Sequence, residues 1–316
     1  MDTEQRPNVS VIDPIGPAIT RVKEILFKPF DLTKWFVIGF CAWLAGLGEG
    51  GGGGGNFNFN VPQRGEAHHM KEAIIENLPW IIPAAIIGFI VFLAIGIVIC
   101  WLSSRGRFMF LHCVAENKAE VKVPWDKFQQ QGNSLFIFRL VVGIIAFICI
   151  AVLIGLMIFF IILISESKGS VIAPIVVGLI FVILLIIAVS IFTGLLMKFT
   201  KDFVVPIMFL GPARCIDGWR KFLRILSINK ARFALYILFQ IVIGMAIGGI
   251  VLAAVFLTCC TACCFLAIPY IGTVLMLPVL IFKRAYSVCY LSQFGPEFDV
   301  LRNGQMVVDA NVVGGD

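Results

Sequence analysis

Apolar residues in this chain fall into six long segments separated by short polar stretches. The first four cover about residues 34–48, 78–102, 135–164 and 171–196. From residue 233 to residue 282 no charged residue interrupts the apolar run. A helix of that length would be about 75 Å long, whereas the hydrocarbon core of a bilayer is about 30 Å thick. We therefore expect the run to fold back near residues 259–264 and to supply the fifth and sixth membrane spans.

The first apolar segment is shorter than the others. As a helix, residues 34–48 rise only about 22 Å against a hydrocarbon core of about 30 Å. We expect this segment to span where the bilayer is thinned or where the end of the helix is shielded. A re-entrant segment is the alternative, but it would leave the cations of the N-terminal region outside the cell.

Lysine and arginine are concentrated on one side of the predicted spans. Of the 25 Lys and Arg residues, 22 lie at or before the start of an odd-numbered segment or after an even-numbered one, and the other three are Arg64, Lys71 and Lys168. Cytoplasmic loops of membrane proteins retain Lys and Arg. The sequence therefore predicts a multi-pass protein of the cell inner (plasma) membrane with its N-terminus and C-terminus in the cytoplasm.

The composition agrees with a membrane protein and leaves little room for a catalytic domain. Hydrophobic residues make up 59% of the 316 residues and charged residues only 14%, whereas soluble domains carry about 25% charged residues. The net charge of +6 indicates a basic face toward anionic lipid, since the cations lie beside membrane segments. We find no phosphate-binding loop, nucleotide fingerprint or nucleophile with a plausible base. The sequence thus favours a non-enzymatic protein with no catalytic residue, no cofactor and no nucleic-acid partner.

Aromatic pairs three residues apart precede the odd-numbered segments. An i, i+3 pair places two rings on one face of a helix, where they can lie at the depth of the lipid headgroups. Basic side chains around the third pair would reach lipid phosphate. The candidate lipid-interface residues are Phe27, Phe30, Trp125, Phe128, Trp219, Arg220, Lys221, Phe222 and Arg224. The alternative is an anchoring helix that recognises no particular lipid.

The recurring aromatic pairs suggest an internal repeat of interfacial helix, span, turn and span. The repeats would cover about residues 14–102, 103–196 and 197–292, within one transmembrane domain of residues 14–292. Chance is the alternative in a chain with 29 Phe residues. Residues 1–13 are expected to be disordered and residues 293–316 to form a cytoplasmic tail. The predicted fold is an all-α bundle of six transmembrane helices, arranged as three hairpins with cytoplasmic amphipathic helices.

The segments 26–30, 124–128 and 218–222 carry a family resemblance. This unit of aromatic amphipathic helix, basic boundary and hairpin resembles the membrane portion of bacterial membrane-anchored glycerophosphodiester phosphodiesterases. It is also similar to several uncharacterised six-span bacterial families. The resemblance implies a helical membrane unit over nearly the whole chain. The catalytic barrel of the phosphodiesterases has no counterpart in this sequence, so their activity does not follow.

A cluster of four cysteines lies at the predicted turn between the fifth and sixth spans: Cys259, Cys260, Cys263 and Cys264. Four thiols within six residues can ligate zinc or form disulfides. A zinc site normally takes ligands from two chain segments, and small cysteine side chains also permit close helix approach. We expect a structural role, with disulfide or redox chemistry and metal binding as alternatives, and we assign no metal site.

The sequence favours a structural, lipid-interacting or accessory role in the membrane. Transport of a small neutral or amphiphilic solute along the repeat axis is the alternative, although ionisable groups that serve ion-coupled transport are missing from the predicted spans. A membrane enzyme that uses the cysteine turn is a third possibility. The expected partners are the bilayer and anionic lipids at its cytoplasmic face, while protein partners are not legible in the sequence.

Overall fold

The structure is a computed structural model that describes residues 9–48, 67–166, 172–211, 214–258, 266 and 268–302. Every regular element in this part of the chain is a helix. The side chains of residues 67–79 are not described. The cysteine cluster at residues 259–264 also lies outside the described residues, so its predicted role stays a prediction.

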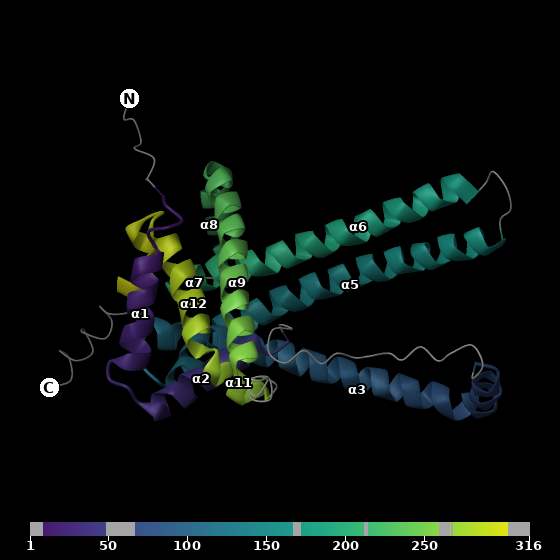
Figure 1. Cartoon of the computed structure of the whole chain (residues 1–316), viewed down its shortest axis with the longest axis horizontal. Coiled ribbons are helices and arrows are strands. Elements are labelled where there is room, and N and C mark those ends of the chain that lie inside the picture. Colours follow the sequence, from purple (N-terminus) through teal and green to yellow (C-terminus); the bar gives the residue numbers. More distant parts are fainter. Residues whose placement is uncertain are drawn as a thin grey trace.

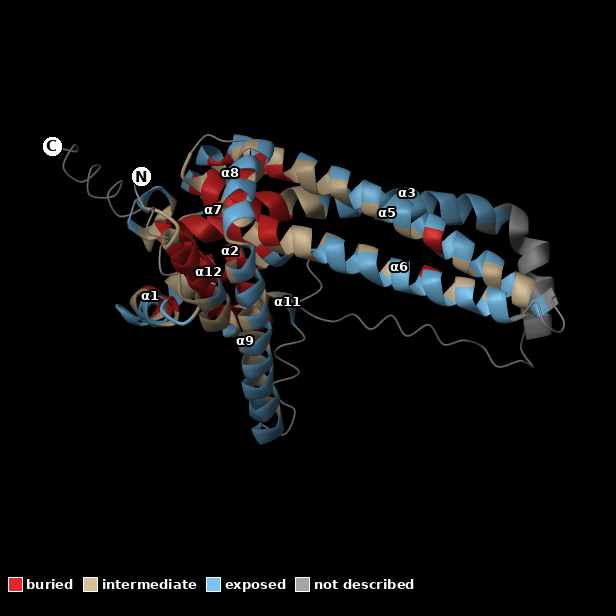
Figure 2. Ribbon diagram, turned by 90° about the horizontal axis from the view of Figure 1, so that it is seen from above, coloured by how far each residue is buried: buried red, intermediate tan, exposed pale blue. Residues whose placement is uncertain are grey.

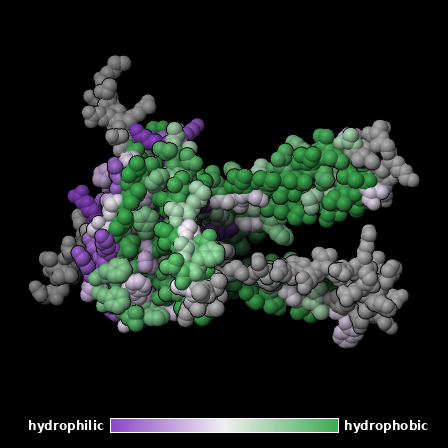
Figure 3. Space-filling view, viewed as in Figure 1, coloured by the Kyte–Doolittle hydropathy of each residue, from purple (hydrophilic) through white to green (hydrophobic). Residues whose placement is uncertain are grey.

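Four helices in the described part are long and apolar enough to cross a membrane. They are α3 (Ala67–Glu116), α5 (Gln129–Glu166), α6 (Ile172–Phe199) and α9 (Lys230–Leu257). In the most apolar part of each helix, almost no residue is buried inside the protein. Figure 3 shows this hydrophobic surface over the projecting helices. Helices that are apolar on all sides and left uncovered by protein are typical of a membrane protein.

The remaining helices gather at one end of the molecule. They are α1 (Ile15–Phe27), α2 (Leu32–Gly46), α4 (Lys122–Lys127), the π-helix η2 (Thr200–Val204), α7 (Val205–Phe209), α8 (Cys215–Ile228), α11 (Pro269–Leu275), α12 (Leu277–Ser292) and the 3₁₀ turn η3 (Pro296–Phe298). We call one part of this end the head: α1, α4, η2, α7, α8 and α12 together with residues 103–116 of α3. Figure 2 shows that the buried residues are concentrated there.

The last turns of α3 form the centre of the head. Every residue from 103 to 115 is buried, which means that the helix is enclosed on all sides. This stretch contains Arg105, Arg107 and His112. The sequence analysis ended the second span near residue 102, but the helix continues to Glu116. The cations that suggested a loop are enclosed by the neighbouring helices of the head.

Two helix pairs are closely packed. A Cβ atom on Gly106 of α3 would lie 2.6 Å from the backbone nitrogen of Ala45 in α2, so only glycine permits this approach. In the α5–α6 pair, the ring of Phe160 covers Gly178 at 3.0 Å from the position of a Cβ atom. These pairs correspond to the first two predicted hairpins.

The third predicted hairpin is not packed along its length. Figure 1 shows α3, α5 and α6 projecting in one direction from the head, whereas α9 runs crosswise to them. The base of α9 contacts α12 through ring pairs such as Tyr236 with Tyr290 (4.7 Å) and Phe239 with Tyr286 (6.0 Å). Further out, no atom of the described residues lies within 4 Å of a Cβ position at Gly244 or Gly248. The face of α9 that carries these two glycines is therefore uncovered in the described part.

Six full spans are not seen in the described residues, because the first and sixth predicted segments are short. The first is α2, with 15 residues, and the sixth breaks at Met276 into α11 and α12. Pro278 accounts for this break, since it lacks the N–H that would continue the helix. The two short segments pack on each other, and Tyr270 Oη donates a hydrogen bond to the carbonyl oxygen of Phe36 (2.9 Å).

Both described ends of the chain are bonded to the head. The backbone nitrogen of Ser10 donates to Gln293 Oε1 (2.8 Å), and Gln293 Nε2 donates to the carbonyl of Ser10 (3.0 Å). Tyr286 Oη donates to the carbonyl of Val11 (2.8 Å), and Val300 is fully buried. The expected disorder of residues 1–13 therefore does not hold for residues 9–13, while residues 1–8 and 303–316 lie outside the described part.

Candidate lipid interface

Helix α8 has one buried and one basic face. Gly218 and Phe222, four residues apart, lie on the face that packs into the head. Arg220, Lys221 and Arg224 are exposed on the other side. Within the described residues, an ion pair is seen with Asp217, whose Oδ1 lies 3.6 Å from Arg220 Nη1. The predicted cationic residues of this helix are thus free to face anionic headgroups.

The aromatic pair of α8 points inward. The ring of Phe222 is fully buried and stacks on Phe203 of η2, with centroids 5.2 Å apart and planes at 9°. Phe233 of α9 meets the same ring edge-on at 5.4 Å. Trp219 is half-buried against Phe138 of α5, at 5.9 Å. Phe222 therefore belongs to the core of the head, and of the predicted interface residues of α8 the three cations are the exposed ones.

The second aromatic pair has the same character. Phe128 is buried between Phe209 (4.8 Å) and Phe108 (5.9 Å), both nearly parallel to it. The guanidinium of Arg105 lies 4.6 Å from the ring centroid of Trp101 and 4.7 Å from that of Trp125. A cation over an indole face is attracted by the ring quadrupole. Trp125 therefore helps to hold a buried arginine in place.

The first pair differs, because both of its rings are exposed. Phe27 is 52% exposed and Phe30 is 62% exposed. Each lies 5.9 Å from the ring of Trp35, whose Nε1 donates to the carbonyl of Leu26 (3.0 Å). Of the three predicted pairs, this one presents both of its rings to the surroundings.

Arginines that the sequence analysis did not single out hold the head together. Arg21 of α1 donates from Nε to the carbonyl of Val114 (3.0 Å) and from Nη2 to that of Ala115 (2.6 Å). The last four carbonyls of a helix lack partners within the helix. Arg21 therefore caps the C-terminal end of α3, and Arg284 similarly donates to the carbonyl of Lys201 in η2 (2.6 Å).

A chain of polar side chains lies where η2 meets α9. Lys198 Nζ is 2.9 Å from Asp202 Oδ2, and the same oxygen accepts a hydrogen bond from Tyr236 Oη (3.2 Å). Gln240 Nε2 donates to Tyr236 Oη (3.1 Å). Gln240 is thereby joined to η2 through Tyr236. Single π turns in helices are frequent at functional sites, but nothing in the local sequence pattern indicates this one.

Four of the described cysteines are buried: Cys41, Cys113, Cys215 and Cys289. Burial raises the pKa of the Cys215 thiol to about 12, so the thiol is protonated and unreactive at neutral pH. Cys113 Sγ lies 3.8 Å from Cys41 Sγ, and both residues are buried between α2 and α3. Within the described residues no group of three or more His, Cys, Asp or Glu side chains could hold a metal ion.

The outer surface of the head is basic. Figure 3 shows its hydrophilic residues gathered at the end opposite to the tips of the projecting helices. Lys23 of α1, Lys28 just after it, Lys122 of α4 and Lys230 of α9 are exposed, in addition to the cations of α8. A surface of this charge beside uncovered apolar helices can bind a membrane that contains anionic lipid.

Comparison with known proteins gives a family but no characterised relative. No curated protein and no solved structure matches the chain. The profile of the family of unknown function DUF7544 matches residues 9–276. This match covers the four long helices and the head except for α12, and it gives no support to a closer link with the phosphodiesterases. The chain therefore belongs to the DUF7544 family of unknown function.

Proposed function

We propose that this protein is a non-enzymatic integral membrane protein with a structural, lipid-interacting or accessory role in the inner membrane. One observation carries the proposal. Four apolar helices are not covered by other parts of the protein, and they project from a packed head whose outer face is basic. The helices provide the membrane anchor. The head provides a cationic surface for anionic lipid, with Phe27 and Phe30 as exposed aromatic contacts and Arg220, Lys221 and Arg224 as charges.

A cytoplasmic location of both termini follows from the same proposal. The described ends of the chain are hydrogen-bonded to each other through Ser10 and Gln293, so they lie on one side. That side is the head, which carries the cations that membrane proteins retain in the cytoplasm.

The six-span, three-repeat architecture is the finer part of the proposal. Phe108 stacks on Phe128 in one unit, and Phe203 stacks on Phe222 in the next, between corresponding elements. The corresponding contact of the third unit is that of α12, which packs on α1 of the first unit. The short segments α2 and α11–α12 would then complete the first and third hairpins in a locally thinned bilayer. The sequence resemblance to the membrane portion of the phosphodiesterases supports the same type of unit.

Transport of a small solute is the second candidate, and it is favoured by the polar chain at η2. Lys198, Asp202, Tyr236 and Gln240 lead from the head into the apolar part of α9. Polar groups at this depth are typical of solute or proton pathways. Solute flux into vesicles that is lost in Asp202→Asn, but not in Asp217→Asn, would favour transport over a scaffold.

Lipid analysis of the intact protein tests the main proposal. The full chain is reconstituted in bilayers of equal parts phosphatidylglycerol and phosphatidylcholine, and the lipids retained after mild extraction are compared. We expect enrichment of phosphatidylglycerol that falls in the triple variant Arg220→Gln, Lys221→Gln, Arg224→Gln, because each cation near an anionic surface contributes about 1 kcal/mol. Asp217→Asn, on the same helix, should preserve the enrichment. Equal retention of both lipids by the intact chain would contradict the proposal.

A further inference from the structure

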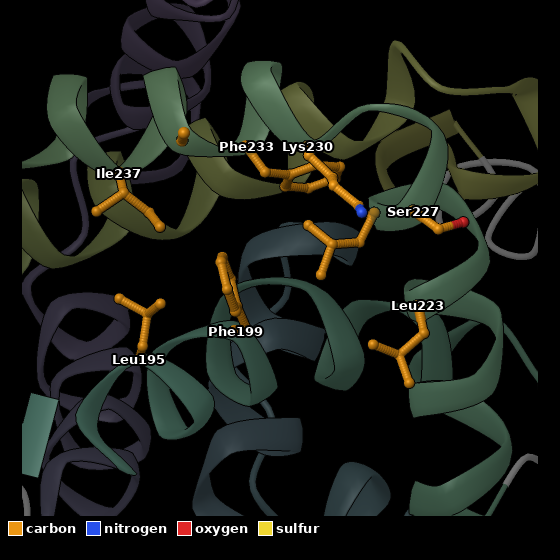
Figure 4. A pocket seen from close by; sticks show the side chains of 9 residues that line it. Leu195, Phe199, Leu223, Ser227, Lys230, Phe233 and Ile237 are labelled. Carbon is orange, nitrogen blue, oxygen red and sulfur yellow. The ribbon is translucent and has the colours of Figure 1, made fainter. Parts of the chain in front are cut away.

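A groove opens where α6, α8 and α9 meet. Its volume is about 380 Å³, within the range of about 300–1,000 Å³ found for small-molecule sites. The apolar walls come from Leu195, Phe199, Leu223, Leu226, Phe233 and Ile237. Figure 4 shows these side chains turned toward a common space, with Leu195 and Ile237 at one end of it. The groove is thus suited to a hydrocarbon chain.

The other end of the groove is cationic. Lys230, the first residue of α9, lies there beside Ser227. Among the described residues that line the groove none is acidic. An anionic group is therefore favoured at this end.

The groove lies where a bilayer lipid can reach it from the side. Its apolar end is formed by α6 and α9, two of the helices that are apolar enough to cross a membrane. Its cationic end lies beside α8, whose outer face carries Arg224 and Lys221. A lipid seated here would have its headgroup at the surface of the head and its chain along the membrane helices.

The corresponding place in the preceding unit is closed. Trp125 and Trp219 are 94 residues apart. At this spacing, Leu195 corresponds to Trp101, Phe199 to Arg105 and Ser227 to Asn133 in the preceding unit. Trp101 Nε1 donates to Asn133 Oδ1 (3.2 Å), and Arg105 Nε donates to the same oxygen (3.4 Å). A tryptophan, an arginine and an amide therefore fill the position that is hollow and apolar between α6, α8 and α9.

We propose that the groove binds one anionic phospholipid, with an acyl chain between α6 and α9 and the phosphate at Lys230. The inference rests on the proposed lipid-interacting function and names the lipid class and the residues of one specific site. It commits to a lipid because the apolar walls and the cationic end match the two halves of an anionic amphiphile.

Native mass spectrometry of the full chain, extracted from bilayers of equal parts phosphatidylglycerol and phosphatidylcholine, tests the site. We expect one tightly retained phosphatidylglycerol in the unchanged protein. Ala234→Trp places an indole in the groove and should remove this lipid. Leu235→Trp, on the exposed side of α9 that points away from the groove, is the matched control and should keep it.

The charge assignment has its own variant. Lys230→Gln should lower the preference for phosphatidylglycerol over phosphatidylcholine about fivefold, the effect of one cation near an anionic group. Lys127→Gln changes an exposed lysine of α4 that lies 3.6 Å from Glu116 Oε1 and does not line the groove, so it should leave the preference unchanged. If Ala234→Trp does not give a folded monomer, Leu223→Trp blocks the groove from the α8 side and serves in its place.

Three results would overturn the proposal: the lipid persists in the groove-filling variant, Lys230→Gln behaves like Lys127→Gln, or a peptide is retained in place of a lipid. The proposed function is tested separately. If the unchanged protein shows no enrichment of phosphatidylglycerol, the proposed function is wrong. If it shows enrichment but retains no lipid that Ala234→Trp displaces, only the groove is wrong.

Discussion

Arg21 is the residue on which the attachment of α1 depends most directly. It is buried, it bonds two terminal carbonyls of α3, and its Nη1 lies 3.1 Å from Glu24 Oε2. Hydrogen bonds to charged groups contribute about 1.5–3 kcal/mol each. Arg21→Gln should therefore lower the free energy of unfolding by about 3 kcal/mol, measured by thermal unfolding in detergent.

A matched lysine on the same helix controls for the loss of charge. Lys23 is exposed, so Lys23→Gln should change stability by less than about 0.5 kcal/mol. Equal melting temperatures for Arg21→Gln and Lys23→Gln would show that α1 is held by its apolar face, through Ala18, Ile25 and Leu26, and not by Arg21.

Aromatic spacing located the interfacial segments but did not show which ring faces lipid. Phe27 is exposed, whereas Phe222 has the same type of spacing and is fully buried. The difference arises from Phe203 and Phe233, which lie on other helices and complete a ring cluster around Phe222. Contacts between distant parts of the chain leave no local sequence pattern. The burial of Arg105 between Trp101 and Trp125 could therefore not be predicted from the sequence either.

At the scale of elements, the crossing of α2 and α3 depends on Gly106. A methyl group there would meet backbone atoms of Ala45 and Leu44 at 2.6–2.7 Å, and backbone cannot move aside as a flexible side chain can. Gly106→Ala should separate the two helices and cost about 1–3 kcal/mol. The measurement is thermal unfolding, with helix separation followed by a pair of labels on α2 and α3.

Gly88 provides the control on the same helix. No atom of the described residues lies within 4 Å of its Cβ position. Because alanine has the higher helix propensity, Gly88→Ala should be neutral or slightly stabilising. A Gly106→Ala variant as stable as Gly88→Ala would contradict the close crossing.

The elements themselves were partly predictable. The apolar runs located α5, α6, α9 and most of α3. These are the four helices of the described residues that are long and apolar enough to cross a membrane. The end of α3 was misjudged because Arg105 and Arg107 interrupt the apolar pattern, while tertiary packing keeps the helix intact to Glu116. The break at Met276 was not predicted, because hydrophobicity is uniform along this uncharged run and does not mark the end of a helix. Pro278 is the physical cause of the break.

At the scale of the whole molecule, the head and the far tip of the α5–α6 pair should lie on opposite sides of the membrane. The cations are gathered on the head, and the pair leaves it as two uncovered apolar helices. Reporter fusions at Lys118 and Arg224 should behave as cytoplasmic, and a fusion at Ser165 as extracytoplasmic. A cytoplasmic signal at Ser165 or an extracytoplasmic one at Arg224 would overturn the topology.

Helix α9 gives the sharpest test of the overall arrangement. It runs crosswise to α5 and α6 (Figure 1), so a flat bilayer cannot hold all three along their axes in this arrangement. Its apolar surface nevertheless lacks any charge beyond Arg232, and such a helix is stable only in lipid. Its ring contacts with the head are confined to the base, at Phe233, Tyr236 and Phe239. We therefore predict that α9 keeps these base contacts, and with them the groove, and that its part beyond Phe239 turns to cross the membrane.

Accessibility labelling of a cysteine placed at Thr258, the last described residue after α9, decides between the two arrangements. If α9 crosses, a membrane-impermeant maleimide added outside intact cells should label Thr258→Cys as it labels Ser165→Cys, while Arg224→Cys stays protected. Each cysteine is compared with the unchanged chain, so that labelling of native thiols is subtracted. Protection of Thr258→Cys from outside, with labelling after the inner face is opened, would mean that α9 lies along the cytoplasmic surface, and the positions of the cations would then no longer predict the path of the chain beyond α8.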